Sequence, residues 1–217
     1  MSNILTHTNH SSIHVKPNQI NDHQLMNPPY DITSNSIRKE RNKLNEDENI
    51  KFSNSLNSNY SYIHSSHTQE DLNNIISLAR ENNSNICMMG SGNSYGDEFQ
   101  NDQNIVINTT KMNKIIGWDS TSGIIEVEPG VTLTDILKIC LLDSWIIPVV
   151  PGVRSPTIGG CIANNIHGKN CYIDGNIGDW VLEFDILLSS GEIITCSNKL
   201  NNELFYSAIG GIGLLGI

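Results

Sequence analysis

The first 59 residues lack the features from which a packed core is built. They contain no tryptophan, no cysteine and no long periodic apolar run, and they are rich in Asn, Ser, His and Ile. A segment of this composition buries too little apolar surface to offset the entropy lost on folding. We therefore expect residues 1–59 to be a low-complexity, disordered head and residues 60–217 to form the folded domain.

The sequence also lacks the marks of a secreted or membrane-spanning chain. Its start, Met1-Ser2-Asn3, is not a basic stretch followed by an apolar run, as a secretory signal would be. No window of about 18 apolar residues occurs, so no membrane span is predicted. These absences favour a cytoplasmic protein.

The cysteines lack any arrangement that would hold a metal. There are five, with neither a C-x-x-C pair nor a Cys/His cluster at zinc spacing, so we expect no metal site. We interpret them as reduced residues packed like small apolar side chains in a cytosolic protein. Cys171 is the one cysteine with a possible functional role, because it adjoins the polar cluster at residues 167–170.

Charged residues are few and unevenly placed. They make up 17% of the chain, and residues 1–67 carry equal numbers of Lys/Arg and Asp/Glu, so the net charge of −10 belongs to residues 68–217. An acidic body argues against a nucleic-acid partner, which requires clustered cations. It does not argue against a phosphate ligand, because glycine loops and helix N-termini bind phosphate through backbone N–H groups.

Two glycine-rich segments carry the functional signal. The first, residues 90–97, reads Gly-Ser-Gly-Asn-Ser-Tyr-Gly-Asp, and the second, residues 157–170, holds Gly159-Gly160 followed by His-Gly-Lys-Asn. Glycines let a backbone approach a ligand closely. Two such segments suggest one long ligand held at two places, with a pyrophosphate in at least one. A P-loop is the weaker alternative, because Asp97-Glu98 stands where it needs Lys-Ser/Thr.

The remaining pattern predicts alternating strands and helices. Capping residues start helices at Thr68 and Thr132, a further short helix opens at Asn202, and short apolar runs separated by turns indicate strands. The expected strands are 60–64, 86–89 and 104–108, with hairpins at 115–119/124–128 and 181–188/192–196. The sequence stops within the apolar run 214–217, which leads us to expect a fold truncated at its C-terminus.

From about Ser61 onward the chain resembles the FAD-binding domain of the vanillyl-alcohol oxidase/p-cresol methylhydroxylase (PCMH-type) superfamily. Within it, the likeness is greatest to the oxidases of decaprenylphosphoryl-β-D-ribose and, more distantly, to the sugar-lactone oxidases. The resemblance rests on five motifs in order: 92–97 (Gly-Asn-Ser-Tyr-Gly-Asp), 150–154 (Val-Pro-Gly-Val-Arg), 157–160 (Thr-Ile-Gly-Gly), 166–170 (Ile-His-Gly-Lys-Asn) and 210–214 (Gly-Gly-Ile-Gly-Leu).

The resemblance implies an α+β domain of two α/β subdomains with FAD between them. The first glycine segment would wrap the pyrophosphate, the second would line the flavin side, and Ile217 would contact the adenine half through its backbone. The residues implied to bind the cofactor are Gly90, Ser91, Gly92, Asn93, Ser94, Tyr95, Gly96, Asp97, Gly152, Thr157, Ile158, Gly159, Gly160, Asn164, His167 and Ile217. The alternative is that these glycines form ordinary turns.

Asn93 bears on how the cofactor is attached. Many members of the superfamily have a histidine at this position, which bonds covalently to the flavin. Asparagine has no nucleophilic ring nitrogen, so the resemblance implies non-covalent FAD.

Two polar residues of the second segment are candidates for catalysis. A cation or N–H donor near the N1–C2 edge of the flavin favours hydride acceptance, and His167 or Lys169 could supply it. His167 could equally hold its own loop through a backbone carbonyl, and Lys169 could be without a role. Arg154 is interpreted as a surface residue rather than a phosphate ligand, and Tyr95 as packing its loop.

By resemblance, the chain would be an FAD-linked oxidoreductase that oxidises a sugar-type alcohol or lactone by hydride transfer to flavin N5. In the superfamily a separate substrate domain covers the flavin and supplies the catalytic base or acid, and this sequence contains none. The alternative is therefore a non-catalytic flavin-binding module that needs a partner chain. We expect this chain alone to be inactive.

Overall fold

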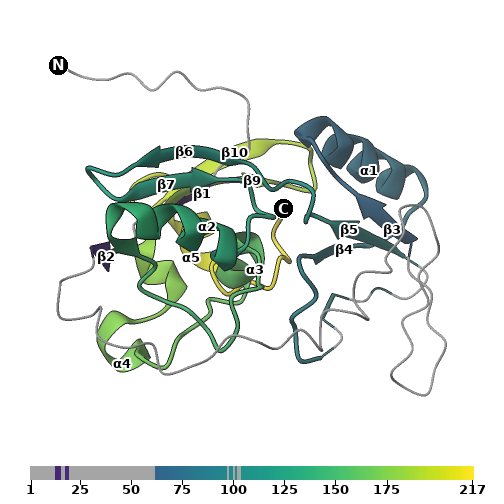
Figure 1. The fold of residues 1–217 in the computed structure, drawn as a ribbon. Helices are drawn as coiled ribbons and strands as arrows, with labels where there is room; N and C mark the ends of the chain where they lie inside the picture. Colours follow the sequence, from purple (N-terminus) through teal and green to yellow (C-terminus); the bar gives the residue numbers. More distant parts are fainter. Residues whose placement is uncertain (1–12, 16–17, 20–61, 97, 100, 102–103) are drawn as a thin grey trace.

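A computed structural model describes residues 13–15, 18–19, 62–96, 98–99, 101 and 104–217. It contains a five-stranded antiparallel sheet, a three-stranded parallel sheet, a two-stranded pair and five α-helices in the described part (Figure 1). The α+β class predicted from the sequence is confirmed.

The parallel sheet forms the smaller unit. Its strands lie in the order β3 (Tyr62–Ser65), β5 (Ile105–Asn108) and β4 (Ile86–Met89), and α1 (Gln69–Glu81) connects β3 to β4. Parallel neighbours require such a crossover connection, because a tight turn cannot join them. This arrangement leaves the carboxyl end of β4 free to lead into the first glycine segment.

Helix α1 begins where the sequence places its cap. The Thr68 hydroxyl accepts the Asp71 N–H at 3.1 Å, and the Asp71 carboxylate accepts the Thr68 N–H at 2.9 Å. This reciprocal pair is the capping box predicted from the sequence, and it satisfies two donors at the helix start. The buried face of α1 consists of Leu72, Ile75, Ile76 and Ala79.

The larger sheet runs in the order β10-β9-β1-β7-β6, and every pair in it is antiparallel. Helices α2 and α3 and the short α5 lie on one face of it (Figure 1). The strands are β1 (Ile13–Val15), β6 (Ile115–Asp119), β7 (Ile124–Val127), β9 (Val181–Leu187) and β10 (Ile193–Ser197). The helices are α2 (Leu133–Cys140), α3 (Ile158–Ala163), α4 (Cys171–Asp174) and α5 (Asn202–Ala208).

Two apolar cores hold the units together. The larger lies between the antiparallel sheet and its helices, where the rings of Phe184 and Phe205 stack with centroids 5.1 Å apart. The smaller lies under α1 and includes Leu72, Ile107 and Leu187. Because Leu187 belongs to β9, the smaller core also joins the parallel sheet to the larger one, which fixes the space between them.

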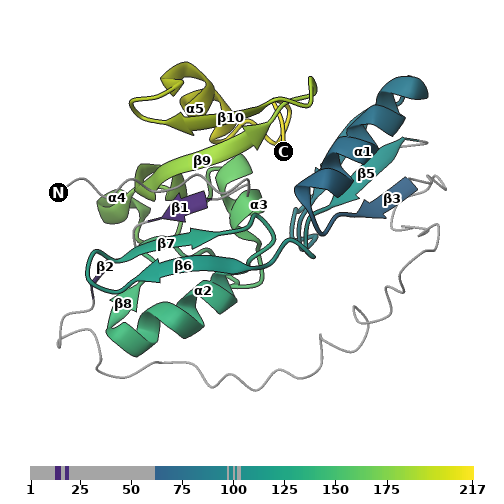
Figure 2. The ribbon, with the colours of Figure 1, turned by 90° about the horizontal axis from the view of Figure 1, so that it is seen from above.

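Part of the segment expected to be disordered contributes strands. Strand β1 lies between β7 and β9, and β2 (Asn18–Gln19) pairs with β8 (Trp145–Ile146) (Figure 2). The prediction is wrong for these short pieces, whose backbones pair with strands already present, so no apolar run was needed. The rest of residues 1–59 lies outside the described residues, and the boundary at residue 60 stays a prediction.

The predicted hairpins and the helices capped by Thr68 and Thr132 are confirmed, and α5 begins at Asn202 as expected. Two local differences remain. Helix α2 ends at Cys140 and continues as a 3-10 turn, Leu141–Asp143. The segment 157–163, expected only as a glycine-rich ligand contact, forms the short helix α3. A second 3-10 turn, Ile177–Trp180, leads into β9.

Candidate functional site

A cleft with a volume of about 350 Å³ lies between the loop that follows β4 and helix α3. Ligand sites for small molecules commonly fall in this size range. Its walls come from three segments distant in sequence: the first glycine segment, the start of α3 with the prolines before it, and the C-terminal residues 212–217. The cleft therefore exists only in the folded chain.

The first wall is the loop that follows β4. In parallel sheets ligands bind beyond the carboxyl ends of the strands, where β4 and β5 deliver Met89 and Thr109 to the cleft. Gly92 turns the loop with a φ of +64°, a conformation that favours glycine. Asn93 Nδ2 donates to Ser91 Oγ at 2.6 Å, so the loop is tied to itself.

The two glycine-rich segments touch each other. A β-carbon added to Gly90 would overlap the Thr157 hydroxyl oxygen, so glycine is required for this close approach. A second link lies nearby, where Ser155 Oγ donates to Asn93 Oδ1 at 3.0 Å. The segments predicted to hold one ligand are thus brought to one place.

The second wall begins with the cap of α3. Thr157, which is 2% exposed, accepts the Gly160 N–H at 3.3 Å and so starts the helix. A β-carbon on Gly159 would lie 3.0 Å from Pro129 Cβ, and one on Gly160 would lie 3.2 Å from Thr157 Oγ1. Gly159 is therefore also needed for packing against Pro129, whereas Gly160 is less confined by the protein.

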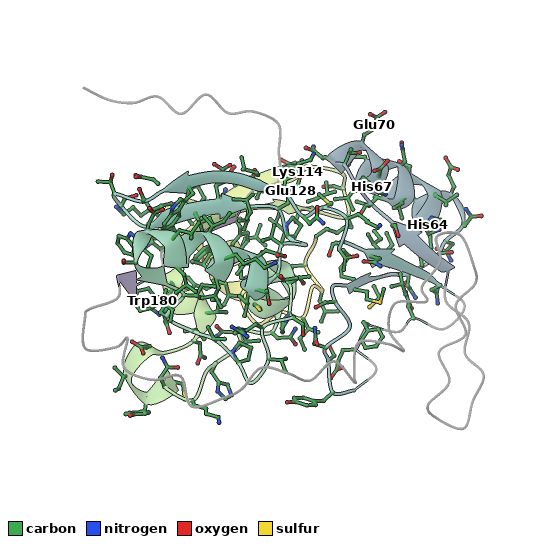
Figure 3. The ribbon with its side chains drawn as sticks, viewed as in Figure 1. His64, His67, Glu70, Lys114, Glu128 and Trp180 are labelled. Carbon is green, nitrogen blue, oxygen red and sulfur yellow. The ribbon has the colours of Figure 1, made fainter. Side chains whose placement is uncertain are left out.

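Pro129 is positioned by the buried carboxylate before it. Glu128, 5% exposed, accepts the Lys114 N–H at 2.8 Å, and the Lys114 ammonium lies 3.7 Å from the same carboxylate. Figure 3 shows this pair beside the junction of the two units. Since Pro129 O accepts the Gly159 N–H at 2.9 Å, the Lys114–Glu128 pair indirectly supports α3.

The third wall is the C-terminal segment. Ile212 lies in the cleft with a φ of +55°, which is strained for a β-branched residue, and Gly213 follows at +73°. The Ile212 N–H donates to Ala163 O at 2.8 Å, which ties the segment to the end of α3. Ile217 was predicted as a cofactor contact, whereas the motif at 210–214 was the only sequence signal for Ile212 and Gly213, whose place in the cleft was not predicted.

Most of the predicted cofactor residues line the cleft. They are Gly90, Ser91, Gly92, Asn93, Ser94, Tyr95, Thr157, Gly159, Gly160, Asn164 and Ile217. Pro129, Pro156 and Gly216 also line it, and sequence reasoning missed them. The Tyr95 side chain is fully exposed, so the expectation that it packs its loop is wrong.

Other predicted residues are placed elsewhere. Gly96 and Gly152 are not among the described residues of the cleft wall, Ile158 is buried in the larger core, and Asp97 lies outside the described residues. His167 and Lys169 are exposed and are likewise not among those described wall residues. His167 Nδ1 lies 3.4 Å from Gly168 O in its own loop. A catalytic role for either stays a prediction.

The cleft offers little formal charge. Among the described residues of its wall, Glu98 is the one charged side chain. Burial raises the pKa of the Cys161 thiol to about 12, so this thiol is neutral at physiological pH. A phosphate-bearing ligand would accordingly be held by backbone N–H groups of the glycine segments rather than by cations.

Comparison with known proteins identifies the family. Residues 61–197, more than half of the chain, match the FAD binding domain family. The chain belongs to this family. Its cofactor is therefore FAD, and the chain is a member of an FAD-binding oxidoreductase family.

Individual relatives agree with this assignment. Decaprenylphosphoryl-β-D-ribose oxidase of Mycolicibacterium smegmatis is 36% identical over 141 residues, which are 64% of this chain and 30% of the relative. L-gulonolactone oxidase of Bos taurus is 27% identical over 148 residues, 68% of this chain and 33% of the relative. The chain thus spans about a third of the length of these relatives.

The fold also resembles a solved structure. The 6-hydroxy-D-nicotine oxidase of Arthrobacter nicotinovorans superposes with a TM-score of 0.64 at 22% identity, covering 71% of this chain and 34% of that one. In the described part of the chain, no helix is long and apolar enough to cross a membrane, and no group of three or more His, Cys, Asp or Glu residues is placed to hold a metal ion.

Proposed function

We propose that the cleft binds FAD non-covalently, with the Gly90–Tyr95 loop around the pyrophosphate and the α3 segment beside the flavin. The observation that carries this proposal is the contact of Gly90 with Thr157, which joins the two glycine-rich segments at one cleft. Asn93 lines the cleft and has no nitrogen able to attack the flavin, which supports non-covalent binding.

Bound FAD supplies a hydride acceptor, flavin N5. We further propose that the substrate is a sugar-type alcohol or lactone, because relatives named for such substrates are similar to this chain over about two thirds of its length. In this reaction the residues described here bind and orient the cofactor. Thr157 and Asn93 keep the two glycine segments together, and Pro129 and Ile212 add apolar surface to the cleft wall.

The alternative proposal is a flavin-binding module that acts only with residues from another chain or segment. It is favoured by the described cleft wall, in which the candidate groups His167 and Lys169 do not appear. A group that takes the substrate proton and a surface that holds the substrate would then come from elsewhere. Both proposals share the same FAD site.

Acid precipitation of the FAD-loaded protein tests the proposed attachment. We expect all yellow colour to remain in the supernatant, because no covalent bond anchors the flavin. Flavin that stays with the pellet would contradict the argument from Asn93. Failure of a demonstrably folded sample to take up FAD would contradict the proposed function itself.

A further inference from the structure

Ile212 has a backbone conformation that its side chain disfavours. In the described part of the chain, five non-glycine residues have a positive φ, and four of them are small and polar: Asn83, Ser144, Asn165 and Asn201. Asparagine visits the left-handed region readily, whereas a β-branched residue there is an outlier. With its φ of +55°, Ile212 is the apolar exception within this group.

The residues around Ile212 are glycines at the positions where the backbone requires them. Gly210 and Gly213 have φ values of +77° and +73°, and a β-carbon on Gly211 would overlap Ser207 O. Glycine at position 212 would relieve the strain in the same way. The backbone conformation therefore does not explain why this position carries an isoleucine.

Packing within the described fold does not explain the isoleucine either. Ile212 is 54% exposed, and it belongs to neither of the two apolar cores. Burial of an aliphatic side chain could offset backbone strain, but little of this residue is buried. Strained residues of this kind are concentrated at functional sites and ligand clamps. The compensating contact is therefore to be sought outside the protein's own cores.

The position of Ile212 indicates where that contact lies. Its N–H donates to Ala163 O at the end of α3, and a β-carbon on the next residue, Gly213, would lie 3.5 Å from Met88 Cγ of β4. Ile212, Ala163 and Met88 all line the cleft. Figure 1 shows this C-terminal segment, in yellow, between the two units. The strained turn thus holds Ile212 at the space assigned to the cofactor.

We propose that Ile212 is a cofactor-binding residue whose side chain packs against one of the two ring systems of FAD. A hydrocarbon side chain has no hydrogen-bonding group and no charge, so it stabilises a planar ring by apolar contact but cannot hold a phosphate. The inference rests on the proposed FAD site and adds to it an opposition of two effects. The strain at Ile212 lowers the stability of the empty protein, and the side chain raises its affinity for FAD.

Replacing Ile212 with glycine or asparagine separates the strain from the contact. Both residues adopt a positive φ readily, and neither has an apolar side chain. Without FAD, each variant of the full chain should melt about 2–4 °C higher than the wild type by circular dichroism. In a fluorescence titration, each should bind FAD about tenfold more weakly, because the apolar contact is lost.

Two controls show that the side chain itself matters. Ile212→Leu keeps an apolar side chain of the same size without the β-branch, so its FAD affinity should stay within about twofold of the wild type. Ser144→Gly relieves a φ of +61° at an exposed turn that is not among the described residues of the cleft wall. This variant should melt at a higher temperature with unchanged FAD affinity.

Titrations with ADP and FMN identify the ring that Ile212 contacts. Weaker ADP binding by Ile212→Asn would assign the contact to the adenine, and weaker FMN binding would assign it to the flavin. Unchanged affinity for both would contradict the proposal.

Three further results would overturn the inference. The first is FAD affinity equal to that of the wild type in the glycine and asparagine variants, and the second is an equal loss of affinity in Ile212→Leu. The third is a lower melting temperature in both the glycine and the asparagine variant, which would show that the side chain stabilises the fold instead. A folded wild type that takes up no FAD would contradict the proposed site, so the two failures are distinguishable.

Discussion

Gly160 lines the cleft in the first turn of α3. Replacing it with Val adds a branched side chain where FAD should contact the main chain, and the nearest protein atom to the new β-carbon, Thr157 Oγ1, lies at 3.2 Å. We expect FAD affinity to fall at least tenfold, which is about 1.4 kcal/mol, in a fluorescence titration.

The matched control is Gly117→Val. Gly117 lies in the outer strand β6, and an added β-carbon would meet Glu126 only at an ordinary 3.8 Å. FAD affinity should be unchanged in this variant. Equal affinities for the wild type and Gly160→Val would mean that this glycine is only part of a turn.

The sequence motifs predicted which residues belong to the site, but they did not predict where each of these residues lies in the fold. The loop glycines and Asn93 were predicted and line the cleft, because a short loop keeps its members together. Ile158 was predicted as a cofactor contact but is buried in the core, because α3 directs Ile158, Cys161 and Ile162 to its buried face. Pro129 carried no motif and was missed.

At the scale of elements, the contact of Gly90 in the β4 loop with Thr157 at the start of α3 can be tested by mutation. Gly90→Ala forces its β-carbon against the Thr157 hydroxyl and should weaken FAD binding about threefold to tenfold by moving the loop. In a Thr157→Ala background the hydroxyl is absent, and the Thr157 β-carbon, 3.5 Å away, leaves room. The Gly90→Ala penalty should therefore shrink in the double variant.

A double-mutant cycle on FAD affinity measures this coupling. Residues in direct contact typically show interaction energies of about 0.5–3 kcal/mol, so a value in this range is expected. Thr157→Ala alone should also lower stability by about 1 kcal/mol through loss of the α3 cap. Additive effects on affinity would show that the two segments act independently.

Elements with their own periodicity were predicted well, and elements made by tertiary pairing were not. Helix α1 carries a capping box and an apolar face, so local pattern and structure agree. Helix α3 contains two glycines, each unfavourable in a helix by about 1 kcal/mol, and forms because Thr157 caps it and Ile158, Cys161 and Ile162 pack beneath the sheet. Strand β1 has only three residues and depends on β7 and β9.

At the scale of the whole molecule, the cleft required contacts that no local pattern encodes. Gly90 and Thr157 are far apart in the sequence and touch only in the folded chain, in which Leu187 joins the core of the parallel sheet to β9. The two glycine-rich segments themselves suggested one ligand held at two places, and the resemblance to a family supplied the expectation that this ligand is FAD. The third wall, with its strained Ile212, became visible only in the folded chain.

Activity of the isolated chain is a prediction for the whole molecule. Hydride transfer requires a substrate carbon held within about 3–3.5 Å of the flavin acceptor atom, and the candidate catalytic residues His167 and Lys169 are not among the described residues of the cleft wall. We expect the FAD-loaded chain not to oxidise sugar lactones or polyprenyl-phosphoryl sugars at enzymic rates. Anaerobic stopped-flow spectroscopy would detect the contrary result as rapid bleaching of the flavin.

Hydrogen exchange of the full chain with and without FAD tests the central claim most directly. If FAD lies between the two glycine-rich segments, amides in residues 88–95 and 157–166 should exchange more slowly in its presence, and those of β6 and β10, away from the cleft, should not change. The Gly160→Val variant should lose this protection at the same FAD concentration. Protection confined to other segments, or none in a folded sample saturated with FAD, would contradict the account.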